Sequence, residues 1–155
     1  MTPAGFQHGA IVNSLASQLD RYVASRQLGL ILAAETGFLV SRDPDTVLAP
    51  DIGFVRQTRL QEIGIPKTYF PEAPALVVEV VSPNDTVEQI DTKMRRWLAA
   101  GVELAWVVHP AGRTVTVYRS KGDIRVLTEQ ETLTADDVLP GFECLVGNLF
   151  ARLSS

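Results

Sequence analysis

Two valine-rich apolar runs, separated by one amphipathic segment, constrain the fold of this chain more than any other feature. Ala75–Val81 and Glu103–Val108 read as strands, and the first is apolar enough to be buried on both faces. Between them, Asp85 and Glu88 form an N-terminal capping pair for a helix that ends at Gly101. Strand, helix and strand within about 35 residues form a βαβ unit, which predicts parallel strands and a right-handed crossover.

The flanking segments predict a mixed sheet around that unit. Apolar residues recur at three- and four-residue steps from about His8 to Gln27, as on one face of an amphipathic helix. Val47–Arg56 reads as one strand, although Pro50 requires an edge position or a bulge there. The other expected elements are strands at 30–35, 38–41, 114–119, 123–128, 133–138 and 142–145, and short helices at 57–65 and 147–153. The predicted fold class is α/β, with a mixed central sheet flanked by helices.

Length and composition indicate one globular domain that spans residues 1–155. Of these residues 46% are hydrophobic and 21% are charged, as in a folded protein rather than a disordered one. The net charge of −4 argues against a DNA coat or a polybasic membrane binder, but a nucleic-acid enzyme needs only a local basic patch. The single cysteine, Cys144, and the absence of a signal peptide or a membrane-length apolar run predict a cytoplasmic protein without a membrane partner.

Two acidic residues lie in the strand-rich centre of the sequence. Glu79 interrupts its most apolar strand, and Asp51 follows Pro50 in a second strand-like segment. An ionised carboxylate inside an apolar strand is costly unless it has a cationic partner, a metal ion or a position at the strand's end. One interpretation is structural: Glu79 forms a salt bridge at the rim of the sheet, and Asp51 belongs to a turn or caps one with its side chain. If the two strands are antiparallel neighbours, the carboxylates and the carbonyl of Val80 instead suit Mg²⁺.

Three further side chains are candidates to accompany these acids. On the predicted helix the buried stripe comprises Val87, Ile90, Met94, Trp97 and Leu98. Lys93 lies just outside this stripe, so its ammonium can extend along the rim of the sheet or into water. Gln89 lies one turn earlier on the same side. His8 precedes the apolar stripe of the first helix, where a helix cap or a surface position is the structural alternative. The sequence has no P-loop, dinucleotide motif or zinc-binding Cys/His spacing.

The order of several short motifs resembles that of the Uma family, which comprises restriction-endonuclease-like proteins with the PD-(D/E)xK nuclease fold. The resemblance extends over nearly the whole chain. Its motifs are HG at 8–9, TGFL at 36–39, APD at 49–51, PALVVEVVSP at 74–83, KMRRW at 93–97, AGV at 100–102, WVVHP at 106–110 and LPGF at 139–142. Family members usually carry an N-terminal helix and hairpin ahead of residues 1–9, and this sequence begins after them.

The resemblance implies a restriction-endonuclease-like core and hydrolysis of DNA phosphodiester bonds with Mg²⁺ or Mn²⁺. It makes Asp51 and Glu79 the two acids that bind the metal. The lysine expected two residues after the second acid is replaced by Val81, and the resemblance implies that Lys93 takes over its role. Such a transfer is chemically acceptable because the ammonium needs only to reach the attacking water or the scissile phosphate.

Two functions of different classes follow from these observations. The first is a metal-dependent endonuclease with DNA as its partner. The second is a catalytically inactive nuclease fold that serves as an interaction or nucleic-acid-binding module, which the acidic composition and the short N-terminus favour. A third hypothesis is a metallohydrolase that uses the same acids on small molecules. We also expect a homodimer, because a small core of this kind has exposed edge strands.

Overall fold

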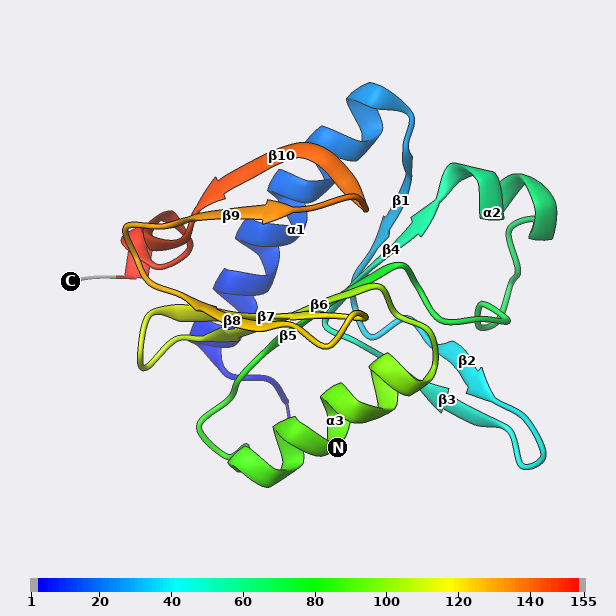
Figure 1. Ribbon diagram of the computed structural model, residues 1–155, viewed down its shortest axis with the longest axis horizontal. Coiled ribbons are helices and arrows are strands. Elements are labelled where there is room, and N and C mark those ends of the chain that lie inside the picture. Colours follow the sequence, from blue (N-terminus) through cyan, green and yellow to red (C-terminus); the bar gives the residue numbers. More distant parts are fainter. Residues whose placement is uncertain (1–2, 154–155) are drawn as a thin grey trace.

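The computed structural model describes residues 3–153, and a six-stranded mixed sheet forms its centre (Figure 1). The strand order is β1-β4-β5-β6-β7-β8. Only β5 and β6 pair in parallel in this sheet, and α3 connects them, so the predicted βαβ unit is confirmed. The bounds are β1 Gly29–Leu32, β4 Ile52–Arg56, β5 Leu76–Val80, α3 Val87–Ala99, β6 Leu104–His109, β7 Thr114–Arg119 and β8 Ile124–Leu127.

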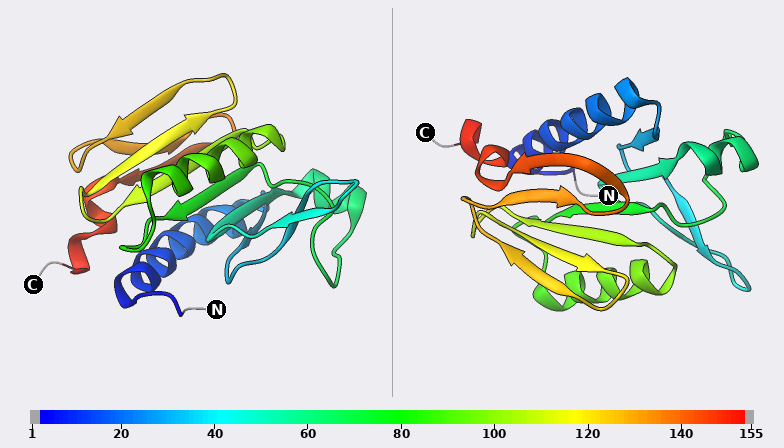
Figure 2. Two further views of the ribbon diagram at one scale, coloured as in Figure 1. Left: turned by 90° about the horizontal axis from the view of Figure 1, so that it is seen from below. Right: turned by 45° about the horizontal axis from the view of Figure 1, so that its top comes forward.

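The two long helices cover opposite faces of this sheet, which creates two separate cores. The right-hand view of Figure 2 places α1 (Phe6–Arg26) above the sheet and α3 below it. Four buried residues of α1 pack on one face of the central strands, and three buried residues of α3 pack on the other. The mixed α/β class with flanking helices is therefore confirmed. Among residues 3–153, no helix is both apolar and long enough to cross a bilayer.

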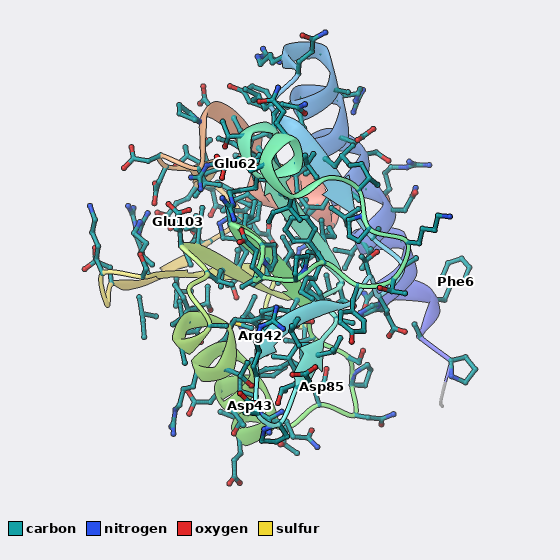
Figure 3. All side chains as sticks on the ribbon, turned by 90° about the vertical axis from the view of Figure 1, so that its right-hand side faces the viewer. Phe6, Arg42, Asp43, Glu62, Asp85 and Glu103 are labelled. Carbon is teal, nitrogen blue, oxygen red and sulfur yellow. The ribbon has the colours of Figure 1, made fainter. Side chains whose placement is uncertain are left out.

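Smaller elements complete these layers. The hairpin of β9 and β10 contributes to the core under α1, whereas the hairpin of β2 and β3 carries Arg42 and Asp43 at its tip, away from the main sheet (Figure 3). A short helix, α2, follows β4 directly. The bounds are β2 Phe38–Ser41, β3 Thr46–Leu48, α2 Gln57–Ile63, β9 Thr132–Ala135, β10 Leu139–Leu145, and two 3₁₀ turns, η1 Val146–Leu149 and η2 Ala151–Leu153.

The predicted single strand at 47–56 is wrong, because two strands in different sheets occupy this segment. β3 pairs with β2, whereas β4 pairs with β1 and β5. Pro50 lies between them and has no N–H to donate to a ladder, so the chain changes partner there. This break puts Asp51 immediately before β4, at the end of the strand that adjoins β5.

The predicted start of α3 also needs correction. Thr86, not Asp85, is the N-cap, and it forms a reciprocal capping box with Gln89. The carboxylate of Asp85 instead accepts a hydrogen bond from the N–H of Ser82 at 2.8 Å, which stabilises the turn after β5. Val87, which the helical pattern placed in the buried stripe, is 88% exposed because it belongs to the first turn, beyond the edge of the core.

The chain enters β1 through a glycine, and replacing this glycine should destabilise the protein. Gly29 has φ +147°, and a Cβ atom there would lie 2.0 Å from the carbonyl oxygen of Val55 on β4. We expect Gly29→Ala to lower the free energy of unfolding by about 2–4 kcal/mol, measured by urea denaturation. The matched control is Gly9→Ala in α1, where the new methyl group meets no atom within 4 Å and helix propensity favours alanine. Equal stabilities of the two variants would contradict this close approach.

Candidate active site

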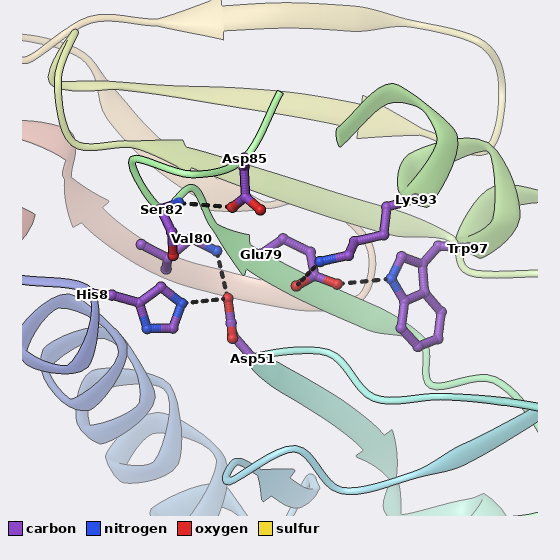
Figure 4. A network of polar contacts seen from close by, with 8 residues as sticks. All are labelled: His8, Asp51, Glu79, Val80, Ser82, Asp85, Lys93 and Trp97. Carbon is purple, nitrogen blue, oxygen red and sulfur yellow. Dashed lines mark hydrogen bonds and ion pairs between the residues drawn. The ribbon is translucent and has the colours of Figure 1, made fainter. Parts of the chain in front are cut away.

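The junction of β4 and β5 brings Asp51 and Glu79 together. The antiparallel register pairs Ile52 with Val78, and one further residue along each strand places the two acids opposite one another. The N–H of Val80 donates to Asp51 Oδ2 over 2.7 Å (Figure 4). In the other direction, the backbone of Asp51 interacts with the carboxyl group of Glu79 and lowers its pKa. The backbone thus ties each carboxyl group to the strand that carries the other.

The carboxyl group of Glu79 points into the core under α3 and is only 4% exposed. The indole Nε1–H of Trp97 donates to its Oε2 at 3.1 Å, and Lys93 Nζ lies 3.9 Å from its Oε1. Lys93 and Trp97 are four residues apart on α3, so the same side of the helix presents both. A single helix therefore supplies one partner for each carboxyl oxygen (Figure 4).

Burial dominates the electrostatics of Glu79. Desolvation raises its pKa to about 7, against the favourable field of the Lys93 ammonium. The nearby charge of Asp51 raises this pKa further, whereas the hydrogen bonds from Trp97 and from the Asp51 N–H lower it. Lys93 does not compensate fully because its side chain is 48% exposed and its charge is shared with water. The site therefore favours an additional positive charge beside Glu79, supplied by a proton or by a cation.

His8 reaches the same site from the first turn of α1. Its Nε2 lies 3.1 Å from Asp51 Oδ2, and both side chains are largely buried. An ionised carboxylate only accepts hydrogen bonds, so Nε2 is the nitrogen that carries the proton toward Asp51. Two donors, His8 and the Val80 N–H, consequently hold Asp51 Oδ2. The contact makes His8 a residue that orients Asp51.

The other candidates lie at the margin of this cluster. The side-chain oxygen of Gln89 accepts from the Thr86 N–H at 2.9 Å, so the capping box occupies it. Val81, at the position where a lysine was expected, packs in the same core as Glu79's helix partners, and α3 covers that face. A lysine at position 81 would reach this region from the strand. Lys93 reaches the same region from α3.

Sequence reasoning assigned Trp97 to the core and missed its contact with Glu79. The helical spacing of apolar residues predicts that the ring of Trp97 is buried. It does not predict which group accepts a hydrogen bond from the indole N–H. The four-residue spacing from Lys93 is the one feature that places Trp97 on the side of α3 that faces the acid.

The donor set fits a hard divalent cation. Asp51, Glu79 and the carbonyl of Val80 offer oxygen atoms only, which Mg²⁺ and Mn²⁺ prefer. Within residues 3–153 there is no group of three or more His, Cys, Asp and Glu side chains suited to hold a metal. An ion at this site would consequently keep several water or phosphate ligands, as Mg²⁺ commonly does. The undercompensated charge of buried Glu79 is consistent with that fit.

Comparisons with known proteins agree with this architecture. The chain is similar to the crystal structure of a putative nuclease belonging to DUF820 from Anabaena variabilis ATCC 29413, with a TM-score of 0.83 and 22% identity over 99% of this chain and 85% of that one. The two proteins thus share a fold. The model of the Uma2 family, described as putative restriction endonuclease, matches residues 1–147, and the chain belongs to this family. No curated protein matches it.

The raised pKa of Glu79 predicts that the protein loses stability as the pH rises. A carboxyl group has a pKa near 4.5 when unfolded, and the folded value is about 7, so folding favours the protonated form. Its stabilising contribution is fully present below pH 4.5 and is lost as the pH rises through 7. Glu79→Gln removes this titration. In the presence of EDTA, we expect the variant to gain about 3 kcal/mol over the wild type between pH 4.5 and pH 8.

The matched control for this measurement is Glu103→Gln. Glu103 is an exposed carboxylate paired with Arg56 at the surface, so its removal should produce no such gain at high pH. Urea denaturation at each pH gives the free energies. A wild type and a Glu79→Gln variant with parallel pH profiles would show that Glu79 is not destabilised in its charged form.

Proposed function

We propose that this protein is a divalent-metal-dependent endonuclease that hydrolyses DNA phosphodiester bonds. The observation that carries the proposal is the pair of opposed carboxyl groups, Asp51 and Glu79, with Lys93 Nζ 3.9 Å from the second. Membership of a family described as putative restriction endonucleases supports the reaction class. Asp51, Glu79 and Lys93 are the proposed catalytic residues.

Asp51, Glu79 and the carbonyl of Val80 would hold the ion, Mg²⁺ or Mn²⁺. When bound, such an ion lowers the pKa of a water ligand and offsets the charge that develops on the phosphate. The hydrogen bond from the Val80 N–H to Asp51 Oδ2 ties the carboxylate before β4 to the strand that carries Glu79. His8 holds Asp51 Oδ2, which restricts the rotation of this carboxylate. The residues of the chain thus form the site before substrate arrives.

Lys93 supplies the positive charge on the substrate side. Because half of its side chain is exposed, the ammonium can leave Glu79 and contact the attacking water or a phosphate oxygen. Arg96, three residues later, lines the same surface hollow as Lys93 and offers a second cation for the DNA backbone. Gln89 also lines this hollow and is an accessory candidate through its amide nitrogen.

The alternative function is a nuclease fold kept as an interaction or nucleic-acid-binding module. The observation that favours it is the acidity of the surroundings: Asp85 and Glu88 line the same hollow as Lys93, and the chain carries a net charge of −4. Such a surface weakens the attraction of DNA phosphates. The two functions differ in whether Asp51 and Glu79 bind a cation.

We also propose a cytoplasmic homodimer. The end strand β8 exposes Ile124 and Val126 on one face, and at the other end of the sheet β1 exposes Leu30. Apolar edge strands of this kind pair readily with a second chain. Sedimentation of the purified protein would distinguish the dimer from the monomer.

A plasmid-cleavage assay with Mg²⁺ tests the nuclease function directly. We expect Asp51→Asn, Glu79→Gln and Lys93→Met each to lower the cleavage rate at least about 100-fold, because each removes a charge aimed at the reacting phosphate or its cation. EDTA should abolish cleavage by the wild type.

Two surface variants are matched controls for that assay. Glu103→Gln and Lys121→Met remove the same types of charge from exposed positions and should cleave like the wild type. Cleavage that survives both Asp51→Asn and Glu79→Gln would overturn the assignment. A wild type that neither cleaves DNA nor binds Mg²⁺ would favour the interaction module.

A further inference from the structure

The indole of Trp97 contacts the proposed metal ligand without facing solvent. Its Nε1 lies 3.1 Å from Glu79 Oε2, and both side chains are buried. An indole N–H only donates, so it can hold a carboxylate oxygen but can never bind a metal itself. The contact thus acts on the orientation of Glu79 and not on the reacting atoms.

The two oxygens of Glu79 have different surroundings as a result. Oε2 is held by the rigid, packed indole, whereas Oε1 faces the flexible and half-exposed Lys93. Trp97 is part of the core formed by α3 and the central strands, so its ring has little freedom to follow a moving carboxylate. Loss of the N–H would free Glu79 to adopt other rotamers.

We infer that Trp97 is a positioning residue of the metal centre, whose indole N–H fixes Glu79 in the orientation that binds a divalent cation beside Asp51. This inference depends on the proposed function, since it assumes that Glu79 is a metal ligand. Partners that orient metal ligands commonly contribute 10- to 100-fold to metal affinity. A residue that only filled space would have no such effect.

Trp106 gives a matched comparison within the same chain. It is also fully buried, on the adjacent strand β6, but its Nε1 has no hydrogen-bond partner among the described residues. Trp97→Phe and Trp106→Phe therefore remove similar ring area, and only the first removes a hydrogen bond to Glu79. The difference between the two variants isolates the N–H group from the loss of packing.

The first experiment measures Mg²⁺ binding by titration calorimetry. We expect Trp97→Phe to weaken the affinity about 10- to 100-fold relative to the wild type and Trp106→Phe to change it less than about threefold. Equal affinities of the two variants would overturn the role of Trp97 and leave the nuclease proposal intact. A wild type that binds no Mg²⁺ would overturn both.

The second experiment does not depend on the folding of Trp97→Phe. The chain has two tryptophans, so Trp106→Phe leaves Trp97 as the only indole fluorophore. Saturation with Mg²⁺ should shift or quench its emission, because the ion changes the carboxylate that accepts its hydrogen bond. Adding Glu79→Gln to this protein should abolish the change. Calorimetric binding of Mg²⁺ without any change in emission would overturn the inference.

Discussion

The burial of one carboxyl group, that of Glu79 on the central strand β5, is the constraint on which the site depends. An unpaired charge at this depth would cost several kcal/mol, so the fold must surround it with donors. Those donors come from two elements on different sides of the strand: the backbone of Asp51 before β4, and Lys93 and Trp97 on α3. The order β4-β5-β6 and the position of α3 are both needed to bring them together.

These donors only partly offset the free-energy cost of burying the charged carboxylate of Glu79. A pKa of about 7 shows that the charged form of Glu79 remains disfavoured in the folded protein. A core selected only for stability would place an apolar residue here, as at the neighbouring positions of β5. Local rules of folding are usually broken where function requires it. The opposed carboxylate of Asp51, which raises the pKa further, is the arrangement that a cation would relieve.

Much of the architecture follows from sequence, but the contacts within the site do not. The valine-rich runs and the helical period between them identify β5, α3 and β6, because both faces of these strands are buried. The approach of His8 to Asp51 joins residues 43 positions apart and depends on how α1 crosses the sheet, which no local pattern specifies. Pro50 signalled an irregularity, yet only the pairing of β3 and β4 with different partners shows that it separates two strands.

The proposed transfer of the catalytic lysine from position 81 to Lys93 fits the layer that α3 forms over β5. Side chains of this strand alternate between the two cores, so positions 77, 79 and 81 share the face that the helix covers. A helix residue on that side can place its ammonium where a lysine two positions after Glu79 would place it. In this proposal Val81 remains apolar at the end of the strand, and Lys93 keeps its access to solvent. α3 therefore covers the core and also carries the lysine of the proposed site.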